Sequence, residues 1–116
     1  MKELKEILFG VNIDSVYGDT NLSISGISFD SRQIKQNNIF IAIKGYDLDG
    51  HNYIDQSINN GASVVVCETL PKKINKYEIV FIKVKCSKTA LYTISSNFYG
   101  NPSSKIDLIG VTGTNG

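Results

Sequence analysis

The sequence predicts a single α/β domain with a small mixed or parallel β-sheet flanked by helices. Residues 39–43 and 63–67 are apolar without alternation, which is typical of strands covered on both faces. A segment with helical spacing follows the first of these strands, and another follows a further apolar strand at 80–84. The chain has 116 residues, a length that supports one hydrophobic core. Strands that alternate with helices favour an α/β sheet over an all-α or all-β domain.

In the first third of the chain, the apolar spacing of Leu4, Ile7 and Leu8 predicts an amphipathic helix over residues 2–9 that ends at Gly10. Residues 11–21 are a polar stretch in which no regular element is predicted. Residues 22–29 alternate imperfectly and predict a strand with a kink at Gly26, because glycine often marks a bend in a strand.

Further along, the strand at 39–43 is followed by a turn-rich loop at 45–50 and a helix from residue 53 that stops at Asn60 and Gly61. Residues 63–67 and 80–84 are predicted strands. Ser87 is a candidate N-cap for a helix that ends near Gly100. The apolar stripe of that helix consists of Ala90, Leu91, Ile94 and Phe98.

Composition excludes several classes of protein. The apolar and charged fractions of 41% and 20% are ordinary for a globular domain. The net charge of +1 gives no broad positive field, so we expect no nucleic-acid partner. No segment has the length of a membrane span, and acids interrupt the N-terminal basic residues, so a cytoplasmic domain without a membrane partner is expected. Cys67 and Cys86 are predicted to be free, buried thiols among apolar neighbours, with a disulfide between them as the alternative that the sequence does not support.

The C-terminal residues have the pattern of a phosphate-binding loop. A predicted strand at 106–111 leads into Gly113, Thr114, Asn115 and Gly116, where glycines allow backbone N–H groups to surround phosphate oxygens. A complete loop of this kind continues with Lys and then Ser or Thr. By itself this segment is also compatible with a plain glycine turn after a strand.

Together with the motifs upstream, however, the segment resembles the junction between the first two domains of the Mur ligases. The residues that carry this resemblance are 98–103, 108–116, Asp30-Ser31-Arg32, 38–42, Gly45, Asp49-Gly50-His51 and Gly61-Ala62. The likeness implies a UDP-sugar-binding N-terminal domain at residues 1–104. It also implies that residues 105–116 are the first strand and incomplete phosphate loop of a central ATPase domain.

The function implied by this resemblance is that of an ATP-dependent ligase of peptidoglycan biosynthesis. The likeness is greatest to members that add the third amino acid to UDP-N-acetylmuramoyl-L-Ala-D-Glu, and the related ligase that adds D-Ala-D-Ala is the alternative. ATP and Mg²⁺ are then cofactors of the full-length enzyme, whose other domains act in cis, and this chain alone is expected to be a catalytically inactive monomer. The family selects L-lysine or meso-diaminopimelate in a C-terminal domain. A stand-alone nucleotide-binding module and a small P-loop NTPase are the interpretations outside the family.

The resemblance also implies which residues bind the UDP end of the substrate. They are Phe29, Ser31, Tyr46, Asp47 and Leu48, with Gly113, Thr114, Asn115 and Gly116 as a partial ATP site. Arg32 is either a ligand of the diphosphate or a structural partner of Asp30. His51 is expected to be a cap or packing residue rather than a base. The sequence contains no arrangement of residues that predicts a catalytic or metal site of its own.

Overall fold

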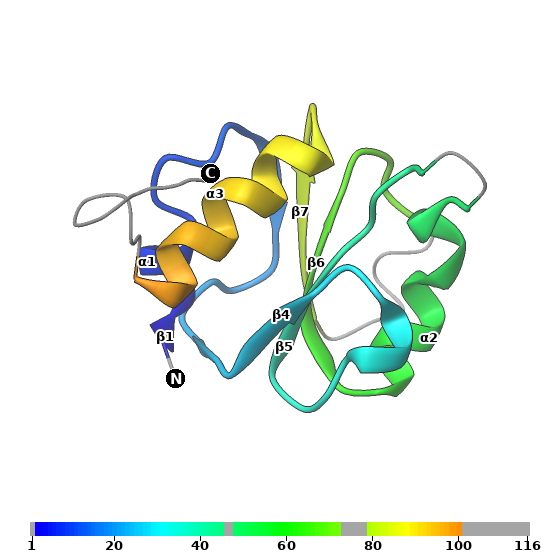
Figure 1. The fold of residues 1–116 in the computed structure, drawn as a ribbon, viewed down its shortest axis with the longest axis horizontal. Helices are drawn as coiled ribbons and strands as arrows, with labels where there is room; N and C mark the ends of the chain where they lie inside the picture. The colour runs from blue at the N-terminus through cyan, green and yellow to red at the C-terminus, as the bar shows by residue number, and fades with distance from the viewer. Residues whose placement is uncertain (1, 46–47, 73–78, 101–116) are drawn as a thin grey trace, which may run out of the picture.

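The structure is a computed structural model that describes residues 2–45, 48–72 and 79–100. Its centre is a mixed five-stranded sheet with the strand order β2-β7-β6-β5-β4 (Figure 1). The strands β4 (Gly26–Ser28), β5 (Asn38–Ile41), β6 (Ala62–Cys67) and β7 (Val80–Val84) are parallel. The edge strand β2 (Ile13–Tyr17) is antiparallel to β7. The predicted α/β class is therefore confirmed, and the sheet is the mixed type.

Helices cover both faces of this sheet (Figure 1). The helices α1 (Leu4–Ile7) and α3 (Ser87–Tyr99) lie on one face, and α2 (Ile54–Asn59) lies on the other. Successive residues of a strand point to opposite faces. In β5, Ile39 and Ile41 accordingly join the core under α1 and α3, whereas Phe40 joins the core under α2. This arrangement confirms that the continuous apolar runs belong to strands buried on both faces.

The N-terminal prediction was partly wrong. Instead of one helix over residues 2–9, residues Lys2–Glu3 form β1, which pairs with β3 (Ser23–Ile24), and α1 is a single short turn. The polar stretch at 11–21 contains β2, which was not predicted. This strand lies at the sheet edge, and Val16 and Tyr17 are 42% and 40% exposed. A half-exposed edge strand carries mixed polar and apolar residues, so its sequence pattern is weak.

The predicted kink at Gly26 is confirmed. The segment divides into β3 and β4, which belong to different sheets, and the Ser25 N–H between them donates to the Asn37 carbonyl oxygen at 2.8 Å. A Cβ atom on Gly26 would lie 3.0 Å from Oδ1 of Asn38 in the neighbouring strand β5, so the close approach of β4 and β5 favours glycine.

The C-terminal ends of α2 and α3 were predicted correctly, whereas the N-cap of α3 was not. Asn60 and Gly61, whose φ is +122°, terminate α2, and Gly100 with φ +86° terminates α3. The predicted N-cap Ser87 was wrong because Cys86 occupies that position and Ser87 is the first helical residue. The Ser87 N–H instead donates to Glu68 Oε2 at 2.8 Å.

The apolar stripe of α3 is confirmed by the burial of Ala90 and Ile94. Cys67 is buried as expected, but Cys86 is exposed, which corrects the prediction for that thiol; both are free. The predicted strand at 106–111 and the boundary between residues 104 and 105 lie outside the described residues.

Candidate functional site

A pocket of about 470 Å³ lies where β4 and β5 end. The carboxyl edge of a parallel sheet is the usual place for a ligand in α/β proteins, because the loops that follow the strands meet there. The lining is mostly apolar with a few polar groups. It consists of Phe29, Asp30, Ser31, Arg32, Phe40, Ile43, Gly45, Leu48, Gly50, Tyr53 and Gln56.

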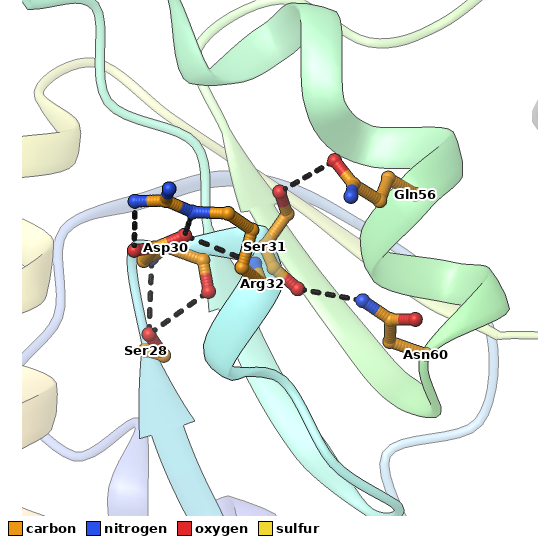
Figure 2. Close-up of polar contacts among 6 residues, drawn as sticks. All are labelled: Ser28, Asp30, Ser31, Arg32, Gln56 and Asn60. Carbon is orange, nitrogen blue, oxygen red and sulfur yellow. Dashed lines mark hydrogen bonds and ion pairs between the residues drawn. The ribbon is translucent and has the colours of Figure 1, made fainter.

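One wall of the pocket is the turn that follows β4. Asp30 is the N-cap of a short 3₁₀ helix, η1 (Ser31–Gln33), and its Oδ1 accepts a hydrogen bond from the Arg32 N–H at 2.9 Å. The Arg32 guanidinium turns back on the same carboxylate, with Nε 3.1 Å from Oδ1 and Nη2 3.0 Å from Oδ2 (Figure 2). These hydrogen bonds hold the pKa of Asp30 below its usual value. Asp30 and Arg32 thus form a neutral pair at the pocket rim.

Ser31 connects this turn to helix α2. Its hydroxyl donates to Gln56 Oε1 at 2.9 Å, and its backbone carbonyl accepts from Asn60 Nδ2 at 2.8 Å (Figure 2). Ser31 is only 5% exposed although it lines the pocket. While its O–H donates a hydrogen bond to Gln56, the hydroxyl oxygen keeps acceptor capacity for a ligand, and the Gln56 amide has two N–H donors of its own.

The loop that follows β5 supplies a second part of the pocket lining. Lys44 and Asp49 form an isolated antiparallel bridge, and the Gly45 N–H donates to the Leu48 carbonyl at 2.7 Å. The Gly50 N–H donates to the Ile43 carbonyl at 2.8 Å. A Cβ atom on Gly50 would lie 2.7 Å from the Ile43 nitrogen, so only glycine fits this position without displacing the backbone. The base of the loop is therefore tightly folded.

The structure brings four of the sequence-predicted residues together. Phe29, Ser31, Leu48 and Arg32 all line this pocket although they come from two separate loops. Tyr46, Asp47 and Gly113–Gly116 lie outside the described residues. Of the two roles considered for Arg32, the pairing with Asp30 is present in the structure.

Sequence reasoning missed Tyr53 and Gln56 as pocket residues. Both follow the loop at the start of α2, and they are three positions apart, so they project from the same side of the helical segment. That spacing after a glycine-rich loop was the available signal. Ile43 and Phe40 were predicted only as strand residues, and they contribute apolar side chains to the pocket lining.

The lining suits a flat, uncharged ring with hydrogen-bonding edges. Phe29 and Leu48 are 61% and 66% exposed, which is unusual for large apolar side chains and leaves them free to contact a ligand. Ser31 and Gln56 supply neighbouring acceptor and donor groups, and Asp30 neutralises Arg32. No group of three His, Cys, Asp or Glu side chains in the described ranges could hold a metal ion, and no described helix is long and apolar enough to cross a membrane.

Comparison with known proteins places the chain in a family. Residues 23–99 match the model of the Mur ligase family, catalytic domain. Over 98% of this chain, a protein from Clostridium tetani is 48% identical and one from Phocaeicola vulgatus is 43% identical. Both are named UDP-N-acetylmuramoyl-L-alanyl-D-glutamate–2,6-diaminopimelate ligase. The chain spans about a quarter of the length of these relatives, 24% of the Clostridium tetani protein and 23% of the Phocaeicola vulgatus protein.

Solved structures agree on the fold. A crystal structure of MurF from Acinetobacter baumannii superposes with a TM-score of 0.70 at 22% identity, covering 88% of this chain and 22% of that one. MurF from Thermotoga maritima in complex with ADP gives a TM-score of 0.53 at 25% identity, covering 65% of this chain and 17% of that one. The family model covers more than half of the sequence, and the chain therefore belongs to the Mur ligase family.

Proposed function

We propose that this chain is the UDP-binding part of an ATP-dependent ligase that adds the third amino acid to UDP-N-acetylmuramoyl-L-alanyl-D-glutamate in peptidoglycan biosynthesis. The observation that supports it best is the pocket at the ends of β4 and β5, which the family resemblance pairs with UDP. The names of the relatives support 2,6-diaminopimelate as the added amino acid. They also support this ligase over the sibling that adds D-Ala-D-Ala, since the MurF likeness at 22% identity concerns the fold.

In this proposal, the uracil ring lies between the apolar side chains of Phe29 and Leu48. The Ser31 oxygen, whose O–H donates a hydrogen bond to Gln56, accepts the N3–H of uracil, and the Gln56 amide donates to a uracil carbonyl. A cytosine ring has an acceptor at the same N3 position. Its lone pair would face the Ser31 oxygen lone pairs, so the pocket should prefer uracil.

Arg32 then acts through Asp30 rather than on the diphosphate. Two of its three guanidinium nitrogens, Nε and Nη2, bind the Asp30 carboxylate. The pair braces the turn that carries Ser31, and it adds no net charge to the rim. The diphosphate and the sugar would leave the pocket toward solvent and the rest of the protein.

The chemistry of the ligase belongs, in this proposal, to the rest of the protein. ATP and Mg²⁺ would be held mainly by the succeeding domains, with Gly113, Thr114, Asn115 and Gly116 contributing backbone donors once a lysine follows. The 116-residue chain should accordingly bind UDP and lack ATP turnover. We further propose a monomer in the cytoplasm, without a nucleic-acid partner.

The test is an NMR titration of the 116-residue chain with UDP and, separately, with CDP. We expect saturable binding of UDP in the micromolar-to-millimolar range, roughly −8 to −4 kcal/mol, since UDP lacks the sugar and peptide parts with which the full substrate would make further contacts. Shifts should centre on residues 29–32, 48–50 and 53–56, and CDP should bind at least about fivefold more weakly. Shifts confined to other surfaces, or no saturation at millimolar UDP, would refute the proposal.

A further inference from the structure

His51 makes contacts that the UDP pocket itself does not explain. It lies in the 3₁₀ helix η2 (Gly50–Tyr53), directly after the pocket loop, but its side chain is absent from the pocket lining. Its Nδ1 is 2.7 Å from Asp49 Oδ1. On the other side of the ring, Nε2 accepts the backbone N–H of Glu68 at 3.0 Å and that of Thr69 at 3.3 Å. The ring therefore joins two segments that are 17 residues apart in sequence.

These partners determine the form of the ring. A nitrogen that accepts two N–H groups cannot carry a proton, so Nε2 is unprotonated. Nδ1 then carries the proton and donates it to the Asp49 carboxylate. Asp49 is well placed as an acceptor because its Oδ1 also receives the His51 backbone N–H at 3.0 Å. The ring is thus the neutral Nδ1–H tautomer, oriented from both sides.

The segment to which His51 binds is itself fixed. Glu68 and Thr69 come directly after β6, where their N–H groups have left the ladder of the sheet. The Glu68 carboxylate accepts the Ser87 N–H at 2.8 Å, at the start of the 13-residue helix α3. A carboxylate at a helix N-terminus is electrostatically favourable, so Glu68 is held against α3. His51 consequently fastens the pocket loop to the rigid centre of the domain.

We propose that His51 is a positioning residue of the nucleotide pocket: its neutral ring, oriented by Asp49, fastens the pocket loop through Nε2 to the backbone amides that follow β6. This inference rests on the proposed UDP-binding function. Asp49 closes the base of the loop through its bridge to Lys44, and Gly50 lines the pocket. The same turn leads into Tyr53 and Gln56, which also line it. Loss of this attachment would let this part of the pocket lining move relative to Ser31.

Three variants of the 116-residue chain separate the two sides of the ring. His51→Gln places an amide oxygen near the position of Nε2 and keeps an acceptor for the Glu68 N–H. His51→Asn places an amide N–H near the position of Nδ1 and keeps the bond to Asp49, but it has no acceptor for Glu68. His51→Ala removes both interactions. UDP affinity is measured for each at a temperature at which its circular dichroism shows that it is fully folded.

We expect His51→Ala and His51→Asn to lose UDP affinity about five- to tenfold, and His51→Gln to stay within about threefold of wild type. The single histidine of the sequence makes its ¹⁵N resonances unambiguous, and they should show a protonated Nδ1 and an unprotonated Nε2. Affinity that is retained in His51→Gln and lost in His51→Asn would not be expected if the His51 side chain only filled space.

The outcomes distinguish this inference from the function on which it rests. A wild-type chain that does not bind UDP refutes the proposed function. If the wild type binds UDP and the folded His51→Ala variant binds it equally well, the function stands and the positioning role is overturned. A proton on Nε2 in the wild type would overturn it as well. Should His51→Ala fail to fold, the comparison of the glutamine and asparagine variants decides the matter.

Discussion

Replacing Ser31 with alanine tests the centre of the proposed pocket. The substitution removes the hydroxyl that donates to Gln56 Oε1 at 2.9 Å, while the backbone bond from Asn60 to the Ser31 carbonyl at 2.8 Å is unaffected. A typical intramolecular hydrogen bond contributes a net 0.5–1.5 kcal/mol. Gln56 is exposed, so water can replace the lost donor. We therefore expect the free energy of unfolding to fall by an amount in the lower half of that range, about 0.5–1 kcal/mol. For a domain of this size that corresponds to a Tm lower by about 2–8 °C.

Ser31→Ala should also weaken UDP binding, and it should remove a larger fraction of the binding free energy than of the stability. Ser31→Ala removes the acceptor proposed for uracil N3–H and frees the Gln56 side chain that should bind a carbonyl of the base. Loss of about 1 kcal/mol of binding free energy reduces UDP affinity about fivefold. The preference for UDP over CDP should fall at the same time, because the acceptor that distinguishes the two bases has gone. Calorimetric or NMR titration with both nucleotides measures both quantities.

Ser63→Ala is the matched control. The Ser63 hydroxyl donates to Asn37 Oδ1 at 3.3 Å, near the amino end of β6 and thus at the edge of the sheet opposite to the pocket. It should show a similar small loss of stability with unchanged UDP affinity. If Ser31→Ala binds UDP and CDP as the wild type does, or if Ser63→Ala loses as much affinity, the assignment of Ser31 to the base is wrong.

Three further predictions concern the charged and thiol groups. The lysine of Arg32→Lys cannot keep both side-chain hydrogen bonds to Asp30. The affinities for UDP and for uridine should therefore fall by the same small factor, within about threefold. A loss of affinity for UDP alone would instead assign Arg32 to the diphosphate. Hydrogen bonds from Arg32 lower the pKa of Asp30, and those from His51 lower the pKa of Asp49, from the usual 3.8. The native state therefore binds fewer protons than the unfolded state in acid. The free energy of unfolding should be at its full value above about pH 4 and should decrease as the pH falls through the pKa values of the folded state. Denaturant unfolding from about pH 5 to 2 measures this decrease, which should be smaller in Asp49→Asn. Burial raises the pKa of the Cys67 thiol to about 11, whereas a hydrogen bond from Thr89 lowers that of the exposed Cys86, so a thiol reagent at neutral pH should modify Cys86 alone until the chain unfolds.

The candidate site could be predicted only in part from the sequence. The family motifs identified Phe29, Ser31 and Leu48, and the structure places these residues around one pocket. Gln56 was missed because a polar residue on a helix has no local feature that marks it as a ligand. Its position becomes meaningful only when α2 packs beside the turn after β4, where the Ser31 hydroxyl meets it.

The sequence by itself determined the parts of the fold that burial encodes locally. Continuous apolar runs identified β5, β6 and β7, and the stripe with Ala90 and Ile94 identified α3, because the periodicity of apolar residues reports directly which faces are buried. Glycines and asparagines identified the helix ends for the same local reason.

Only the tertiary structure decided the contacts between distant segments. Strand β2 exists because Ile13 pairs with Val84 across the chain, and its own half-exposed sequence is compatible with a loop. The hydrogen bonds from Glu68 and Thr69 to His51 likewise depend on where β6 ends relative to the pocket loop. Strand order, register and the contact between two loops are non-local properties. The pattern of apolar residues along the chain indicates which residues are buried, but it does not indicate which residues they contact.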